Sequence, residues 1–183
     1  TPEKDRIDLH CTLKESNIKP FEMFTQGVFS NVSGLANGVI NVKGPLSKPD
    51  IDGKIVLTNS SLLMDYLGLP LKIKTATITI DEKKIDLGTF DVYDKYGSKA
   101  IAGGRIYHKN FDNLNFDIFI KDLKNFNCME IAEEQNDLFF GKAFVDGHST
   151  IKGYLDELNL NIYAKTRPKT SISLPLTSKT ENA

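Results

Sequence analysis

An alternation of residue types with a period of two runs through residues 33–59 and constrains the fold more than any other feature of the chain. In residues 34–44 one parity carries only small or apolar side chains, namely Gly34, Ala36, Gly38, Ile40, Val42 and Gly44. The other parity is mostly polar. Because successive side chains of a strand point to opposite faces, this pattern predicts a strand with one apolar face. Pro45 and Pro49 then predict a turn, after which Ile55 and Leu57 resume the inward set.

Similar alternations predict most of the remaining chain to be strand. They cover residues 6–14, 75–80, 85–93, 100–106, 114–120, 158–164 and 170–176. A change of inward parity around Gly88 predicts a bulge in the strand 85–93. The dipeptide Asp146-Gly147 is typical of a hairpin turn. The alternation over residues 139–153 nevertheless continues unbroken across it, so we expect one long strand there.

Three segments depart from the period of two. In residues 20–29, Phe21, Phe24 and Val28 recur at three to four residues after Pro20, which predicts a short helix covering an end of the sheet. Residues 60–71 contain Gly68 and are expected to be irregular. Residues 122–137 are expected to form a short helix or an irregular loop.

The predicted fold class is therefore all-β, with mostly antiparallel or mixed strands and one apolar face throughout. Such a sheet can close against a second sheet as a β-sandwich, or it can remain an elongated curled sheet that forms a trough. Alternation by itself does not separate these two folds. We expect one β-rich domain over residues 1–176 and a polar tail over 177–183, as an excised segment of a longer protein.

Composition narrows the range of functions. The 183 residues carry a net charge of −1, which gives no electrostatic case for nucleic acid or for an anionic membrane surface. No run of 18 apolar residues suggests a membrane-spanning helix. Cys11 and Cys128 have no CxxC spacing, so a zinc or redox site is not expected, and a disulfide between them is left open.

The sequence contains no recognisable catalytic constellation. His10, His108 and His148 fall at solvent-facing strand positions or strand ends, so we expect all three at the surface. Their spacing does not match metal ligands. Acidic pairs lie in charged turns, where a solvated surface is the usual role. The glycines lack the strand–turn–helix context of a phosphate-binding loop. We therefore expect no enzymatic activity, no metal and no cofactor.

Glycines recur at even offsets within the predicted strands. The candidate structural glycines are Gly38, Gly44, Gly53, Gly141, Gly147 and Gly153. An even offset places each pair on one strand face. Glycine inside a strand marks either a local bend or a close approach by another backbone or a ligand.

Several segments in order resemble one protein family. These are GVINVKGPL (38–46) with PDIDG (49–53), FFGKA (139–143), STIKG (149–153), NLNIYAKT (159–166) and ISLPL (172–176). Together they resemble the C-terminal region of TamB (translocation and assembly module) proteins, particularly the Bacteroidetes type. The resemblance extends over residues 27–176.

The resemblance implies a fold, a location and a role. TamB-like proteins, which are similar to AsmA-like bridge proteins, are anchored in the inner membrane, span the periplasm and curl repeated strands into a taco-shaped trough with an apolar interior. They work with an Omp85-class outer-membrane barrel of the TamA type. By this resemblance the chain would be a periplasmic segment whose groove binds or conducts phospholipid acyl chains between the two membranes. The alternative is an interaction or chaperone module that assists assembly of outer-membrane proteins.

The inward residues of the predicted strands would line this groove. They are Leu9, Ile40, Val42, Ile55, Leu57, Ile78, Ile80, Ala102, Ile106, Phe116, Ile118, Ile120, Ala143, Val145, Ile151, Leu160 and Ile162. Three hypotheses use the same residues: a lipid-binding groove, an interaction module with open strand edges, and a structural repeat that stacks on its neighbours.

Overall fold

Strands dominate the computed structural model, which describes residues 5–24, 29–154 and 156–175. The strands are β1 (Arg6–Asn17), β2 (Phe29–Pro45), β3 (Asp50–Met64), β4 (Leu69–Ile80), β5 (Lys84–Tyr93), β6 (Lys99–Lys109), β7 (Asp112–Ile131), β8 (Phe140–Tyr154), β9 (Glu157–Thr166) and β10 (Ser171–Ser173). Three 3₁₀ helices, η1 (Lys19–Phe24), η2 (Asp65–Leu67) and η3 (Glu133–Gln135), lie in connections between strands. The tail expected over residues 177–183 lies outside the described residues.

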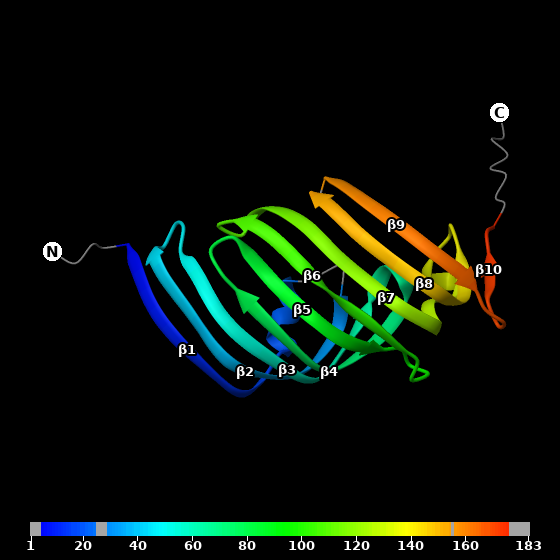
Figure 1. Ribbon diagram of the computed structural model, residues 1–183, viewed down its shortest axis with the longest axis horizontal. Helices are drawn as coiled ribbons and strands as arrows, with labels where there is room; N and C mark the ends of the chain where they lie inside the picture. Colours follow the sequence, from blue (N-terminus) through cyan, green and yellow to red (C-terminus); the bar gives the residue numbers. More distant parts are fainter. Residues whose placement is uncertain (1–4, 25–28, 155, 176–183) are drawn as a thin grey trace.

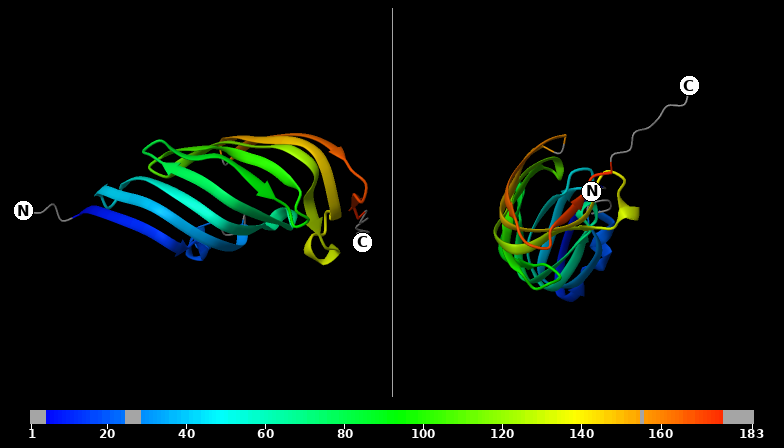
Figure 2. Two further views of the ribbon diagram at one scale, coloured as in Figure 1. Left: turned by 60° about the horizontal axis from the view of Figure 1, so that its bottom comes forward. Right: turned by 90° about the vertical axis from the view of Figure 1, so that its right-hand side faces the viewer.

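The described strands form one antiparallel sheet in sequence order from β1 to β8 (Figure 1). At its far edge both β9 and β10 pair with β8, so they share one strand position. The sheet curls into an open trough, which is plainest in the end view of Figure 2. The all-β prediction and the curled sheet are confirmed, and the alternative of two packed sheets is wrong.

Two local predictions are confirmed in the ladder. β8 runs from Phe140 to Tyr154 without a turn at Asp146-Gly147. In the β5–β6 ladder the register shifts between Asp86 and Gly88, where the expected bulge lies. Gly88 has φ +62°, a conformation that a residue with a Cβ rarely adopts, so the bulge depends on glycine.

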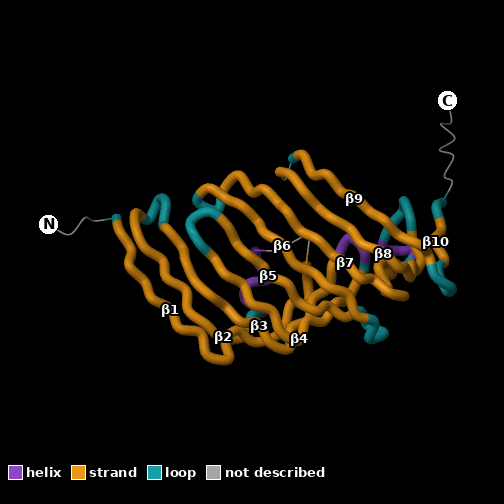
Figure 3. Tube along the Cα trace, viewed as in Figure 1, coloured by secondary structure: helices purple, strands orange, loops and turns teal. Residues whose placement is uncertain are grey.

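The expected irregular segments prove to be mostly strand, as the tube in Figure 3 makes clear. Within residues 60–71, β3 continues to Met64 and β4 begins at Leu69, with only the short η2 between them. Gly68 ends η2 in the left-handed conformation, so the glycine that suggested irregularity makes a tight connection instead. Within residues 122–137, β7 continues to Ile131.

The prediction missed the second half of β7 because bulges break its period of two. The β7–β8 register shifts between Ile120 and Leu123, between Leu123 and Phe126, and again after Asn127. Each bulge adds a residue and changes the parity of the inward side chains. A search for strict alternation therefore loses the strand where it is most irregular.

The helix expected over residues 20–29 is shorter and of another type. η1 is a 3₁₀ helix that ends at Phe24, and Phe29 already belongs to β2. Residues 25–28 lie outside the described residues. η1 lies beside the sheet and is tied to β2 by a hydrogen bond from the Val32 backbone N–H to Glu22 Oε2 (2.9 Å).

At several glycines the backbone of the neighbouring strand lies so close that a side chain would not fit. A Cβ on Gly38 of β2 would lie 2.1 Å from the carbonyl oxygen of Lys54 on β3, and Gly38 itself faces Ile55. The same is true of other candidate glycines, whose Cβ would come within 2.5 Å of a carbonyl oxygen: Gly53, Gly141, Gly147 and Gly153. Gly44 differs, because its nearest contact would be 3.7 Å away. The close approach is therefore made by the adjacent backbone.

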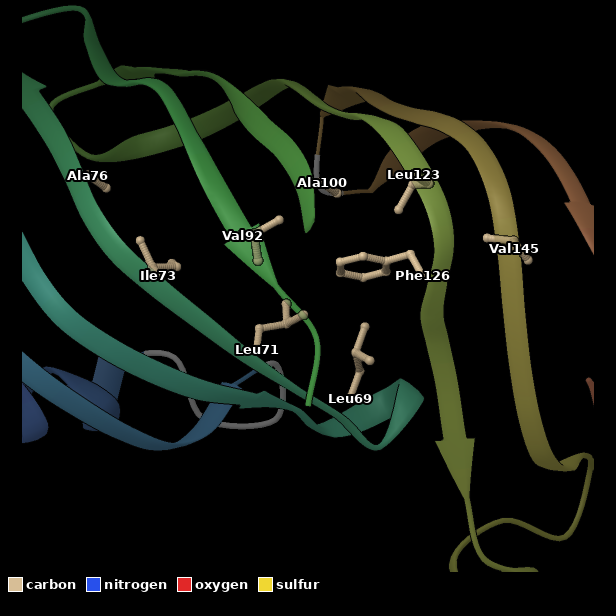
Figure 4. Close-up of a cluster of buried hydrophobic side chains, with 9 residues drawn as sticks. All are labelled: Leu69, Leu71, Ile73, Ala76, Val92, Ala100, Leu123, Phe126 and Val145. Carbon is tan, nitrogen blue, oxygen red and sulfur yellow. The ribbon is translucent and has the colours of Figure 1, made fainter. Parts of the chain in front are cut away.

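A compact apolar cluster lies between β4 and β8 on the inner side of the curl (Figure 4). Its buried members are Leu69, Leu71, Ile73, Ala76, Val92, Ala100, Leu123, Phe126 and Val145. Side chains from β4 and from β7 point into the same space, so the curl brings non-neighbouring strands into contact. A second, smaller cluster contains Met129, Ile131 and Ala143.

A candidate apolar groove on the inner face

The ladders place the predicted groove residues on one face of the sheet. Directly opposite residues of paired strands share a face, and the chain of pairs Val42–Ile51, Ile55–Ile78 and Ile106–Phe116 links them from strand to strand. At the far edge Ile151 lies opposite both Ile118 and Leu160, which carries the same face to β9. The members predicted from the sequence are thus brought together, although they come from eight strands.

This inner face has two halves that differ in packing. The filled half lies toward the hairpins β3–β4, β5–β6 and β7–β8 and contains the buried cluster of Figure 4. The open half lies toward the hairpins β2–β3, β4–β5, β6–β7 and β8–β9. None of the predicted groove residues of the open half is fully buried: Leu9, Ile40, Val42, Ile55, Ile78, Ile80, Ile106, Phe116, Ile118, Ile151, Leu160 and Ile162.

The chain itself closes the filled half. β4 and β7 extend past the shorter β5–β6 hairpin and pack against each other there. The tip of the β3–β4 hairpin reaches β7, since a Cβ on Gly68 would lie 2.2 Å from the Glu130 carbonyl oxygen. Tyr66 and Phe139 meet edge to face with ring centroids 5.8 Å apart. Of the predicted groove residues, Ala143 and Val145 are buried in this half, and Leu57, Ala102 and Ile120 are partly buried against the cluster.

Sequence reasoning missed five of the residues that fill this half, namely Leu69, Leu71, Ile73, Leu123 and Phe126. Leu69, Leu71 and Ile73 do alternate, but the first two lie beside Gly68 in the stretch 60–71 that was expected to be irregular. Leu123 and Phe126 lie in the bulged part of β7. The alternation of Leu69, Leu71 and Ile73 could have identified the start of β4. The bulged part of β7 has no regular alternation by which it could have been identified.

In the open half the apolar side chains remain in contact with solvent. Exposure is 36% for Ile151, 44% for Leu9, 58% for Leu160 and 65% for Ile162. Exposed apolar residues that stand singly are ordinary, but a continuous row on one concave face usually marks a binding surface. The open half is therefore the candidate site.

The opposite, outer face carries charges in complementary pairs. Arg105 Nε donates to Asp86 Oδ2 at 2.9 Å, and Lys152 Nζ lies 3.1 Å from Asp117 Oδ1. The hydrogen bond from Arg105 lowers the pKa of Asp86, with further help from the Gly88 backbone N–H. The outer face is therefore charged and solvated, whereas the inner face is apolar.

Polar groups also hold the filled half together. Asp94, with 1% of its surface exposed, accepts backbone N–H bonds from Tyr96 (2.9 Å), Ser98 (2.8 Å) and Asn127 (2.7 Å). The first two close the β5–β6 turn and the third ties that turn to β7. Because a buried carboxylate requires such donors, these bonds account for its position inside the molecule.

Glu130 forms ion pairs with two lysines from different elements. Its Oε1 lies 2.6 Å from Lys95 Nζ and 2.8 Å from Lys142 Nζ, and the Tyr96 hydroxyl donates to Oε2 at 3.3 Å. Partial burial opposes ionisation of Glu130, but the ammonium groups of Lys142 and Lys95 outweigh it and lower the pKa of the carboxyl. This cluster joins the β5–β6 turn to β7 and β8.

One histidine prediction is wrong. His108 is not at the surface but 8% exposed, because its ring stacks on Phe111 with centroids 4.2 Å apart. Its Nδ1 accepts a hydrogen bond from the Phe111 backbone N–H at 3.3 Å. His10 and His148 are exposed, as expected.

In the described part of the chain, no group of three or more His, Cys, Asp or Glu side chains could hold a metal ion. Both cysteines are free, and burial raises the pKa of the Cys128 thiol. No helix of the described residues is long and apolar enough to cross a membrane.

Comparison with known proteins gives no assignment. No family model, no curated protein and no solved structure matches the chain.

Proposed function

We propose that the chain binds phospholipid acyl chains along the open half of its inner face. The observation that carries this proposal is the packing difference between the two halves of one apolar face. The chain fills and covers one half with its own side chains, and leaves the other half apolar and partly exposed across strands from β1 to β9.

The energetics favour an apolar occupant. Moving hydrocarbon out of water is worth about 0.8 kcal/mol per methylene. Two tails of about 16 carbons would thus be worth roughly 25 kcal/mol at most, if they were wholly removed from water. A continuous apolar surface can supply part of this amount, while the polar head group stays in solvent beside the trough.

The resemblance to TamB-like proteins supports a more specific setting. In that setting the chain is a periplasmic segment of an inner-membrane-anchored protein, and its groove forms one part of a path for phospholipid between the inner and outer membranes. An Omp85-class barrel would be the partner of the whole protein. No catalytic step is part of this proposal.

The test pairs an inner and an outer substitution on one strand. Ile78→Asp places a carboxylate in the open half, whereas Thr79→Asp places one on the exposed outer face beside it. Binding is measured with a fluorescent phospholipid and by native mass spectrometry of protein purified from cells, after circular dichroism has shown that both variants are folded. We expect Ile78→Asp to weaken lipid binding at least tenfold and Thr79→Asp to leave it unchanged.

A second inner-face variant keeps the test informative if Ile78→Asp does not fold. Ile151 is 36% exposed, so Ile151→Asp removes less buried apolar contact than Ile78→Asp does and is expected to weaken binding in the same way. The proposal is overturned if the unaltered chain retains and binds no phospholipid, or if folded inner-face variants bind it as well as Thr79→Asp does.

A further inference from the structure

The two edges of the sheet are unequally protected against pairing with another strand. β1 is interrupted by a register shift between Leu13 and Ser16, where Glu15 has φ +46°, and it carries charges along its length. Such irregularities and charges discourage edge-to-edge association. β9 has no such irregularity: its ten residues pair with β8 in one unbroken register and include no proline.

The exposed side chains of β9 are also mostly uncharged. Within Glu157–Thr166 the charged residues are Glu157 and Lys165, which stand near opposite ends. Between them the inner face carries Leu158, Leu160 and Ile162, exposed by 46%, 58% and 65%. A long, regular and apolar edge of this kind is a template for a further strand.

The residues of β9 are complementary to a second, antiparallel copy of β9. A two-fold axis perpendicular to the sheet, midway between the two copies of Asn161, places Leu160 opposite Ile162 of the other copy and Leu158 opposite its Ala164. On the outer face it places Glu157 opposite Lys165 at both ends. Opposite charges and apolar pairs in directly facing positions each stabilise a sheet.

The charges at both ends of β9 are available for this pairing. Among the described residues, neither Glu157 nor Lys165 forms an ion pair. Lys165 faces Asp146 across the β8–β9 ladder and contributes to the lowered pKa of that carboxyl, but the ion pair of Asp146 is with Arg167. In the two-fold arrangement each Lys165 would gain a carboxylate directly opposite on the same outer face.

We propose that β9 is a docking edge for a second copy of this chain, in the register that places Asn161 opposite Asn161. The perpendicular two-fold axis keeps the inner faces of both copies on the same side. The two sheets then join into one, and their apolar inner faces become continuous. This inference does not require lipid binding, although Leu160 and Ile162 also belong to the open half. It rests on the free backbone edge, on apolar pairs of the inner face and on charges of the outer face.

The experiment measures mass and register on the full chain. Light scattering after size-exclusion chromatography is expected to show, with rising concentration, a species of twice the 20.4 kDa chain mass. For register, Asn161→Cys and the control Asn159→Cys are made in a Cys11→Ser background. Facing residues in an antiparallel pair have Cα atoms about 4.5–5.5 Å apart, within reach of a disulfide.

The control is matched because both positions lie on the outer face of β9. In the proposed register Asn159 faces Tyr163, and the two copies of residue 159 are offset by four residues, roughly 13 Å. Mild oxidation is therefore expected to cross-link Asn161→Cys into a dimer at least tenfold faster than Asn159→Cys. A chain that stays monomeric at every concentration, as it would if this edge served only strands of other proteins, overturns the proposal. So does equal cross-linking of both variants, or cross-linking of Asn159→Cys alone.

Discussion

At the scale of single residues, Asp81 and Asp94 each accept backbone hydrogen bonds within a turn between strands, but only Asp94 also bonds to a distant strand. Asp81 accepts backbone N–H bonds from Lys83 (2.8 Å) and Lys84 (3.0 Å), both at Oδ1. Asp94 uses Oδ1 in the same way within its own turn, but its Oδ2 accepts a third bond from the Asn127 N–H on β7. The sequence predicts both turns, whereas the burial of Asp94 depends on a distant strand.

This difference predicts unequal effects of one substitution. Asp81→Asn keeps the oxygen that accepts both of these bonds and should change the free energy of unfolding by less than about 0.5 kcal/mol. Asp94→Asn replaces Oδ2 by an amide that cannot accept the Asn127 N–H, so a buried donor loses its partner. We expect a loss of about 1–3 kcal/mol in urea unfolding. Equal effects of the two substitutions would contradict the role assigned to Oδ2.

At the scale of elements, regular strands and a strand with one bulge were predictable, whereas a strand with several bulges was not. β8 was identified because its alternation crosses the Asp146-Gly147 signal without a break, and the bulge at Gly88 because parity changes there. The second half of β7 carries several such changes within ten residues, with positive φ at Asp122 and Asn125. Alternation depends only on neighbouring residues of the chain. It therefore cannot identify a strand segment whose bulged shape is set by the packing of Phe126 against the distant strand β4.

Glu130 on β7 predicts how this region responds to acid. Its pKa in the folded protein is lowered from the ordinary value of 4.5, so the folded state holds fewer protons than the unfolded state as the pH falls below that value. The stabilisation is present above pH 4.5 and is lost as the pH falls through the lowered pKa. The free energy of unfolding should therefore decrease with acidification in this window.

The measurement compares two glutamine variants over that pH range. Glu130→Gln should flatten the pH dependence of urea unfolding, because the lysine partners no longer favour an ionised group. Part of the slope should remain, since the pKa of Asp86 and that of Asp146 are also lowered, chiefly by Arg105 and Arg167. Glu134→Gln on η3, an exposed position, serves as the control. An unchanged slope in Glu130→Gln would show that its ion pairs are not maintained in solution.

At the scale of the whole molecule, the curl was not deducible from alternation. A sandwich and a trough both place one apolar face inward, as Ile40 and Phe116 do here. What separates them is that β4 and β7 of the same sheet pack against each other, and that contact involves Leu69, Leu71 and Phe126, outside the alternation that was recognised. The residues of the open half were predicted individually from the sequence. That this half stays open could not be predicted, because it depends on the packing of β4 against β7 in the filled half.

This asymmetry predicts a gradient of local stability across one continuous sheet. Amides of the filled half, such as those of Phe126 and Val145, open only when buried contacts are lost, whereas amides near Ile40 and Ile106 lie under partly exposed side chains. Native-state hydrogen exchange should therefore show slower exchange in the filled half. Added phospholipid should slow exchange in the open half more than in the filled half, because a ligand that binds only the closed form protects the amides that it covers. Uniform protection without lipid would contradict the two-half description, and an equal effect of lipid on both halves would place the lipid elsewhere.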